Sequence, residues 1–381
     1  MPDMPDMPDN PPTIRQLAAL AGVSRTTVSL ALRNHPSIGA DTRKRIQKLA
    51  EEKGYRMDPL VSSLMNRLRV SRVKRTTERI AYLTFWDTPN DWRENVNEFG
   101  YYQGACRRAL HLGYEIEHFW AKEPKLTYAR LSRILYNRGI RGVLLAPLPQ
   151  HLGHVSLEWR YFSCAALSLT ILKPLLHRAS HNYREGMMLA LRTLKRYGYR
   201  RFGFANSAMF DQRIKHGWLS GFLTYQYEMP VNQRVPPLLL EEWRETEEWR
   251  PNSQLLQTKF SKWLDKYQPD VVISNTLHPL AHFKSLGLRV PEDIGYVSLH
   301  RLGASDPWAG IDRLSAQIGA AAVDMVASQL QNNEFGLPEY PKTVQLDGLW
   351  CDGPTVVNRF HLTEADAPED ALAQPAGKSA R

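Results

Sequence analysis

The hydrophobic pattern divides the chain into a short helical region and a long alternating one. Between residues 13 and 54, apolar residues recur every three or four positions, which is the period of an amphipathic helix. From residue 79 onward, short apolar runs alternate with stretches of helical period. We therefore predict an N-terminal all-α domain followed by an α/β domain with parallel sheets. The expected strands are 79–86, 114–120, 141–146, 162–167, 201–205, 270–274 and 294–299, and the expected helices are 94–112, 126–138, 183–197, 254–267 and 316–331.

The helical region contains the start and stop signals of three helices. Thr13 and Gln16 fit a capping box, and Gly22 ends the first helix. Ser24 suits the N-cap of a second helix over about 25–32. A third helix is expected over about 41–53.

A helix, a tight glycine turn, a short second helix and a supporting helix form a helix-turn-helix unit. The N-terminal end of the second helix, where Arg25 and Thr26 lie, would enter the major groove of DNA. The alternative is a generic three-helix bundle with a solvated face. The turn, the small polar residues at its tip and the local charge favour the helix-turn-helix.

The charge of the chain is concentrated in the same region. The whole chain of 381 residues carries a net charge of +10. Residues 13–79 hold 15 Lys and Arg against five Asp and Glu, whereas residues 80–381 hold 34 against 31. This distribution indicates a nucleic-acid-binding module joined to a nearly neutral larger domain.

Several other classes of protein are disfavoured by the composition. No run of 18 apolar residues is present, so we expect no transmembrane helix and no membrane partner. The first ten residues lack the features of a secretory signal, and the three cysteines are widely spaced, which together predict a cytoplasmic protein. Residues 1–12 and 361–381 are expected to be disordered tails.

The helical region resembles a known family. The stretches TIRQLAALAGVSRTTVSLALRN and TRKRIQKLAEEKGY are similar to the DNA-binding domain of the LacI/GalR family of bacterial transcription regulators. The resemblance implies a DNA-binding domain over 13–56, with Arg33 at a position where the family often has Asn. It also implies that Arg25, Thr26 and Leu30 contact base edges.

The chemistry of these side chains agrees with that role. Arg25 can make a bidentate contact to guanine, and Leu30 offers only apolar contact, for instance to a thymine methyl. Four further polar residues are interpreted as phosphate contacts, which position the domain without specifying sequence. These are Thr13, Ser24, Thr27 and Asn34.

Residues 57–79 are expected to form a hinge helix and a basic linker. In the family, a short helix at this place folds on DNA, pairs with its twin in a dimer, and wedges a leucine into the minor groove. By its distance from the Gly54-Tyr55 pair, Leu64 is the matching leucine. Segment 66–79 is longer than the family norm and strongly basic. It either extends the hinge helix or tracks phosphates, or it serves as a flexible solvated linker.

The resemblance continues through residues 80–360, where YGYRRFGFANS and LGLRVPEDIGYVSLH are similar to family segments. The implied fold is a periplasmic-binding-protein-like domain of two parallel-sheet subdomains, which binds an effector and dimerises. Ligands bind such folds at the carboxyl ends of strands.

The residues expected to contact an effector depart from the family pattern. Trp218 stands where the family often has Arg, and Leu299-His300 replaces its Phe-Asp. Losing both charges argues against a standard sugar clamp, and Arg213, His300 and Arg301 would favour an anionic or differently shaped ligand. The candidates also include three residues at strand ends. Two of them are aromatic and would either stack against a ligand or be ordinary core and rim side chains. These are Phe85, Trp86 and Asn275.

The sequence therefore predicts a dimeric transcription regulator, most simply a repressor, that reads a pseudo-palindromic operator. A small-molecule effector, expected to be a sugar or a related metabolite, would bind in the cleft of the C-terminal domain and modulate the affinity for DNA. One alternative is a DNA-binding regulator without an effector, controlled by a partner protein. An enzyme is the remote alternative, because no P-loop, G-x-G-x-x-G, G-x-S-x-G or H-E-x-x-H motif occurs. We expect no cofactor and no metal site.

Overall fold

The structure, a computed structural model, describes residues 12–35, 37–55, 78–149, 152–240, 254–301 and 306–360. Most of the predicted hinge segment, including Leu64, lies outside these residues, as does the C-terminal tail. The described residues fall into two compact units. Unit 1 comprises the residues up to Asn182 together with Arg213–Lys215 and Leu314–Asp347, and unit 2 comprises Tyr183–Gln212, His216–Arg313 and the residues from Gly348 onward.

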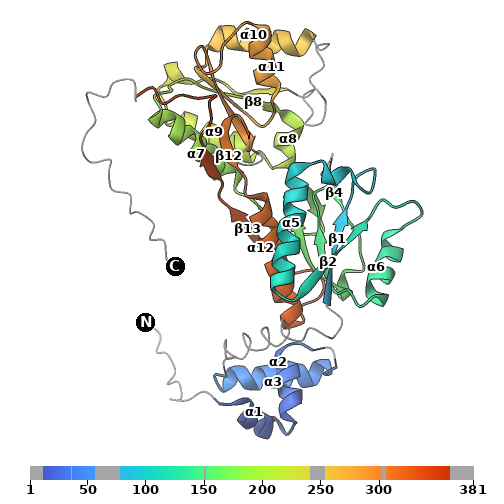
Figure 1. Cartoon of the computed structure of the whole chain (residues 1–381). Helices are drawn as coiled ribbons and strands as arrows, with labels where there is room; N and C mark the ends of the chain where they lie inside the picture. Colours follow the sequence, from blue (N-terminus) through green and yellow to red (C-terminus); the bar gives the residue numbers. More distant parts are fainter. Residues whose placement is uncertain are drawn as a thin grey trace, which may run out of the picture. The chain divides into compact units, whose positions relative to one another are not determined.

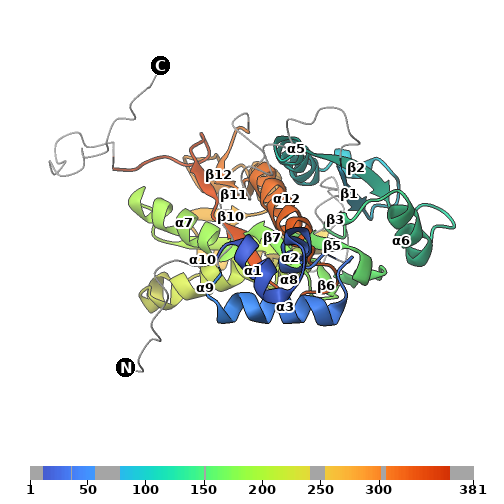
Figure 2. The ribbon, with the colours of Figure 1, turned by 90° about the horizontal axis from the view of Figure 1, so that it is seen from below.

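The N-terminal part of unit 1 is a cluster of three helices (Figures 1 and 2): α1 Ile14–Ala21, α2 Arg25–Leu32 and α3 Ala40–Glu52. Thr13 and Gln16 form the predicted capping box, and Gly22 has φ 66°, a left-handed conformation that glycine adopts without a Cβ clash. The helices share a small apolar core. Its buried members are Leu17, Ala18, Ala21, Val28, Ala31, Ile46 and Ala50.

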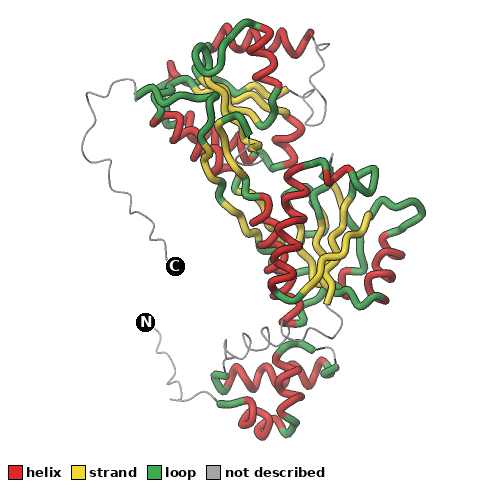
Figure 3. Tube along the Cα trace, viewed as in Figure 1, coloured by secondary structure: helices red, strands yellow, loops and turns green. Residues whose placement is uncertain are grey.

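The rest of unit 1 is built on a six-stranded sheet with the order β13-β7-β5-β3-β1-β2. All neighbouring strands in it are parallel. The strands are β1 Glu78–Thr84, β2 Tyr114–Trp120, β3 Gly142–Leu145, β5 Ser163–Leu167, β7 His177–His181 and β13 Thr343–Leu346. Figure 3 shows these strands running between helices.

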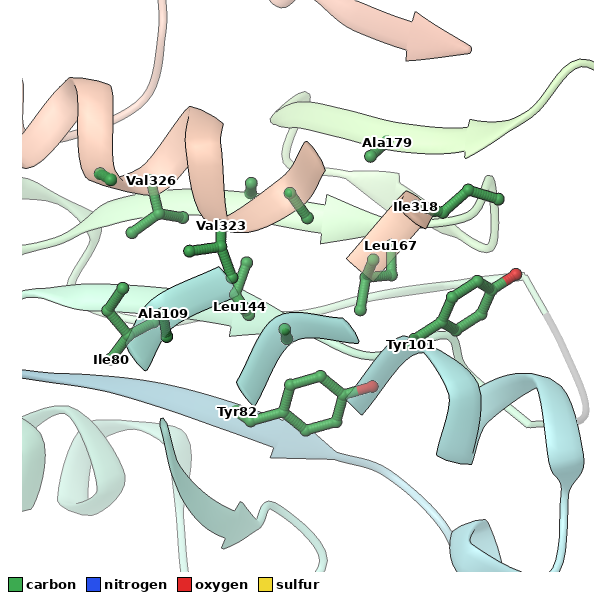
Figure 4. Packing of buried hydrophobic residues seen from close by; sticks show 14 of the residues in the cluster. Ile80, Tyr82, Tyr101, Ala109, Leu144, Leu167, Ala179, Ile318, Val323 and Val326 are labelled. Atoms are coloured by element: carbon green, nitrogen blue, oxygen red, sulfur yellow. The ribbon is translucent and has the colours of Figure 1, made fainter. Parts of the chain in front are cut away.

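Two long helices cover one face of this sheet. They are α5 Val96–His111 and α12 Ser315–Asn332, and their apolar side chains meet those of the strands in one core (Figure 4). Helix α6 Tyr128–Asn137 contributes Leu131 and Leu135 to the core on the other face. A two-stranded ribbon, β4 Gly153–His154 with β6 Ile171–Lys173, joins the second core through Val155 and Ile171.

Unit 2 repeats this layered arrangement with a sheet of order β14-β12-β11-β10-β8-β9, in which only the β12–β14 pair is antiparallel. Its strands are β8 Phe202–Ser207, β9 Leu238–Leu240, β10 Val271–Ser274, β11 Gly295–Arg301, β12 Ala309–Asp312 and β14 Leu349–Cys351. Its helices are α7 Tyr183–Arg196, α8 Ala208–Arg213, α9 Gly217–Tyr227, α10 Gln254–Tyr267 and α11 His278–Ser285, the last residue of α8 being grouped with unit 1.

The predicted fold class is confirmed. A helical N-terminal domain precedes two subdomains with parallel sheets, and every predicted strand and helix of the α/β region is present within a few residues of its expected bounds. None of the helices in the described ranges is long and apolar enough to cross a membrane.

The approach of α5 to α12 depends on two glycines. A Cβ built on Gly104 would lie 1.8 Å from the carbonyl oxygen of Ala316, and one built on Gly319 would lie 2.0 Å from that of Tyr101. Each contact is far shorter than the sum of the van der Waals radii, and each involves backbone that cannot rotate away. The two helix backbones can therefore touch only while both positions lack a side chain.

We expect Gly319→Ala to lower the free energy of unfolding by roughly 1–3 kcal/mol, because the methyl group forces the helices apart in a well-packed core. Chemical denaturation followed by circular dichroism measures the change. Ser328→Ala, at an exposed position of the same helix, is the control and should change stability by less than about 0.5 kcal/mol. Equal stability of the two variants would contradict the close-packing argument.

Candidate nucleic-acid interface and ligand-binding residues

The N-terminus of α2 is a preorganised polar surface. Ser24 is the N-cap of α2, and its Oγ accepts a hydrogen bond from the backbone N–H of Thr27 at 3.0 Å. The hydroxyls of Ser24 and Thr27 also lie 2.9 Å apart and hydrogen-bond to each other. Both predicted phosphate contacts are thus held in fixed positions at the same helix end.

The predicted base-reading residues lie on this helix. Arg25 and Thr26 are exposed in its first turn, and Leu30 is half-buried one turn later. No acidic side chain occupies the first turn of α2. The positive end of the helix dipole and the Arg25 guanidinium therefore act together on an approaching anion.

The other two predicted phosphate contacts have structural partners. Thr13 is exposed, but its hydroxyl donates to Oε1 of Gln16 at 2.9 Å within the capping box. Asn34 has a left-handed backbone with φ 56°, and its Oδ1 accepts a hydrogen bond from Nε2 of Gln47 at 2.7 Å. The Gln47 bond orients the amide, and the NH₂ group of Asn34 is the part that can donate to a phosphate oxygen.

Helix α3 supplies residues that the sequence interpretation did not single out. Gln47 also donates to the carbonyl of Ala31 at 3.2 Å, and Arg43 donates to that of Asn34 at 3.2 Å. Arg45 donates to the carbonyl of Ala21 at the end of α1, at 3.1 Å. The spacing of Arg43 and Gln47, four residues apart on one helix face, was the only signal that could have pointed to this pair.

In unit 1, the structure changes the interpretation of the predicted aromatic wall. Phe85 is 2% exposed and lies in the core beside the β4–β6 ribbon, so its proposed stacking role is abandoned. Trp86 is half-buried, and its Nε1 donates to the Glu98 carboxylate at 2.7 Å. Arg213 donates to the carbonyl of Leu148 at 2.8 Å.

In unit 2, two candidates are parts of the scaffold. Trp218 is fully buried and packs edge-on against Tyr183, with ring centroids 5.2 Å apart. Arg301 is 6% exposed, and its Nη1 donates to the carbonyls of Trp308, Cys351 and Asp352 at 2.7–3.2 Å. Both side chains therefore contribute to the packing of unit 2, and their contact with an effector stays a prediction.

The protonation state of His300 decides whether it can bind an anion. Burial, with a smaller contribution from nearby Arg313, holds the pKa of His300 well below its usual value. The imidazole is therefore neutral near pH 7 and cannot supply the positive charge that an anionic ligand would need.

The carboxyl end of the unit 2 sheet carries a polar group that the sequence interpretation missed. Asn206, in β8, is fully buried, and neither Nδ2 nor Oδ1 has a hydrogen-bond partner among the described residues. Strand β8 pairs with β10 in parallel, and Asn275 directly follows the last residue of β10. Asn275 is 4% exposed, so a buried amide lies at the carboxyl end of each of these two neighbouring strands.

A buried carboxylate with a partly exposed histidine beside it lies close to β8 in sequence. Oδ2 of Asp211, which has no exposed surface, lies 2.5 Å from Nδ1 of His216. Burial raises the pKa of Asp211, while the His216 contact acts in the opposite direction. This contact joins α8 to His216, the N-cap residue of α9.

The comparison of sequences finds a match for the N-terminal domain. Residues 13–58 match the family described as bacterial regulatory proteins, lacI family. The chain is also 49% identical over 43 residues to the HTH-type transcriptional regulator AglR of Rhizobium meliloti (strain 1021). That alignment covers 11% of this chain, and the chain spans only 12% of the length of this curated relative.

The comparison of folds extends the likeness to most of the chain. A complex of the transcriptional regulator CelR with cellobiose is 18% identical, with a TM-score of 0.50 over 90% of this chain and 99% of that one. The lac repressor dimer bound to operator and the anti-inducer ONPF is 16% identical, with a TM-score of 0.50 over 91% and 100%.

A putative LacI-family regulator from Rhizobium etli is 13% identical, with a TM-score of 0.54 over 74% of this chain and 99% of that one. At these identities the solved structures establish a common fold. Residues 13–58 thus match the lacI family of bacterial regulatory proteins, and the chain as a whole shares the fold of these solved regulators.

Proposed function

We propose that this protein is a sequence-specific DNA-binding transcriptional regulator that acts without catalysis. The observation that carries the proposal is the N-terminus of α2, where Arg25 and Thr26 are exposed beside the Ser24–Thr27 hydrogen bonds in a family-matched helix-turn-helix. In this proposal Arg25, Thr26 and Leu30 contact bases, and Ser24, Thr27 and the Asn34 amide contact phosphates.

The proposed organisation follows the sequence boundaries. Residues 13–56 bind DNA, 57–79 form the hinge with Leu64 as the minor-groove wedge, and 80–360 bind an effector and dimerise, between tails at 1–12 and 361–381. A homodimer would place two helix-turn-helix units on a pseudo-palindromic operator in the bacterial cytoplasm.

The effector is proposed to be a neutral, hydroxyl-rich small molecule bound at the carboxyl end of the unit 2 sheet. An amide offers one acceptor and two donors, which match the hydroxyl groups of a sugar. The buried amides of Asn206 and Asn275 support this class of ligand. An anionic ligand is not favoured, because His300 is neutral and Arg301 donates to backbone carbonyls. CelR, a structural neighbour, was solved with cellobiose, which makes disaccharides the first ligands to test.

For base readout, we expect Arg25→Ala to lower discrimination at one base position of the operator by roughly 1–3 kcal/mol. Binding measured on a set of single-base operator variants, at fixed salt, gives the change. Arg15→Ala, an exposed arginine on α1, is the control and should leave base preferences unchanged. A uniform loss across all operator variants for Arg25→Ala would contradict direct readout.

For positioning, Gln47→Ala should weaken binding to every operator variant equally, because it frees Asn34 and the end of α2 without touching a base. The loss of its hydrogen bonds to buried groups should also destabilise the N-terminal domain by about 1–3 kcal/mol. Denaturation and operator titrations measure the two effects. Lys48→Ala, at the exposed neighbouring position, should leave stability unchanged, and altered base preference in Gln47→Ala would show that Gln47 itself reads sequence.

For the effector, Asn206→Leu should abolish the rise in melting temperature that a bound disaccharide produces, while leaving the ligand-free protein as stable as before or about 1–3 kcal/mol more stable. The gain arises because an unpaired buried amide is removed. Thermal unfolding with cellobiose and other mono- and disaccharides is the measurement, and Asn232→Leu, at an exposed site, is the control.

If none of these sugars raises the melting temperature of the wild-type protein, the result would count against a sugar effector. If metabolites of other classes also had no effect, the result would favour control by a partner protein. Equal responses of wild type and Asn206→Leu would remove Asn206 from the site.

A further inference from the structure

Strand β7 in unit 1 carries two buried polar side chains on one face. Arg178 is 5% exposed and Ser180 is fully buried. Ala179, between them, belongs to the core beneath α5 and α12 (Figure 4). Because side chains alternate along a strand, Arg178 and Ser180 face the opposite side of the sheet, where the β4–β6 ribbon and α6 pack.

Both side chains have unused hydrogen-bonding groups. Nη2 of Arg178 donates to the carbonyl of Ile171 at 3.3 Å, but Nη1 has no partner among the described residues. The Ser180 hydroxyl has none in this part of the chain either. Unpartnered buried donors are rare in folded proteins, so two on neighbouring same-face positions require an explanation.

The missing partner of Arg178 must also balance a charge. A guanidinium remains protonated in proteins, and burying it without a counter-ion is strongly unfavourable. Burial lowers the pKa of Arg178, and no carboxylate in the described ranges forms an ion pair with it. An anion would remove this cost, whereas a water molecule would satisfy only the hydrogen bond.

The geometry restricts the size of that anion. Side chains two apart on a strand start about 6.6 Å from each other, and each can reach toward the space between them. A guanidinium N–H and a hydroxyl O–H can both donate to the oxygens of one small carboxylate or phosphate group.

The segment that contacts Arg178 is the strand β6, through the carbonyl of Ile171, and it continues into the turn after it. Ile171 at 1% exposure and Leu176 at 0% anchor the ends of this segment, whereas Leu172 and Leu175 between them are 36% and 61% exposed. The middle of the segment thus has few apolar contacts with the unit beneath it, and its displacement would open a path to Arg178 Nη1.

We propose that Arg178 and Ser180 form a binding site for a small oxyanion, bordered by residues 171–175. The site is separate from the proposed DNA interface and from the proposed effector residues of unit 2, and it is measured without DNA.

Thermal unfolding of the full-length protein tests the site, with sodium phosphate and sodium acetate compared against sodium chloride at equal ionic strength. We expect one of the two oxyanions to raise the melting temperature by about 2–4 °C beyond chloride, and the salt that does so identifies the anion class. Arg178→Met should lose this rise, and Ser180→Ala should weaken the apparent affinity several-fold. Arg133→Met, an exposed arginine on α6, is the control and should respond as the wild type does.

Two outcomes would overturn the proposal. One is a wild-type protein that responds to phosphate and acetate no more than to chloride. The other is an undiminished anion response in both Arg178→Met and Ser180→Ala. If Arg178→Met does not fold, the wild-type comparison and Ser180→Ala still decide the question.

Discussion

The position of α2 depends on hydrogen bonds that α3 donates to the ends of the two helices before it. The carbonyls of Ala21, Ala31 and Asn34 lie at or just after helix C-termini, where the regular helical hydrogen bonds end. Arg45, Gln47 and Arg43 reach these groups from one supporting helix. A small apolar core alone would let the short helices slide past one another. These directional bonds instead fix the orientation of α2, and with it the orientation of the N-terminal turn that is proposed to contact DNA.

In the α/β region, helix α12 also has to be held in one position, and close backbone contacts hold it there. The chain of unit 1 is completed by α12 and β13, which come more than 130 residues after Asn182, where the long N-terminal segment of the unit ends. Helix α12 therefore has to dock by surface fit, without a short loop to guide it. The backbone contacts at Gly104 and Gly319 supply that fit, because they hold α12 at one height along α5. Parallel strands then align their carboxyl ends at one edge of each sheet, which is where the buried amides of Asn206 and Asn275 lie.

Hydrophobic periodicity was sufficient to predict most of this architecture. Strands such as 114–120 and helices such as 254–267 have uninterrupted apolar patterns, and the structure places them at those bounds. Strand β7, with the sequence HRASH, was missed because its buried positions are polar. Site residues were harder to predict, since Phe85 and Arg301 have the chemistry of ligand contacts, and only packing reveals that both serve the scaffold.

Arg178 and Arg301 show how such residues can be told apart. Both are arginines with about 5% of their surface exposed, and both lie in strands of parallel sheets. Arg301 donates from one nitrogen to three carbonyls, so the protein itself provides the acceptors that a buried guanidinium requires. Arg178 reaches one carbonyl at 3.3 Å, and its other terminal nitrogen has no hydrogen-bond partner within the described ranges. A buried charge of the first kind holds the fold together, whereas one of the second kind weakens the fold until an anion binds, and that dependence on a second species is what defines a binding site.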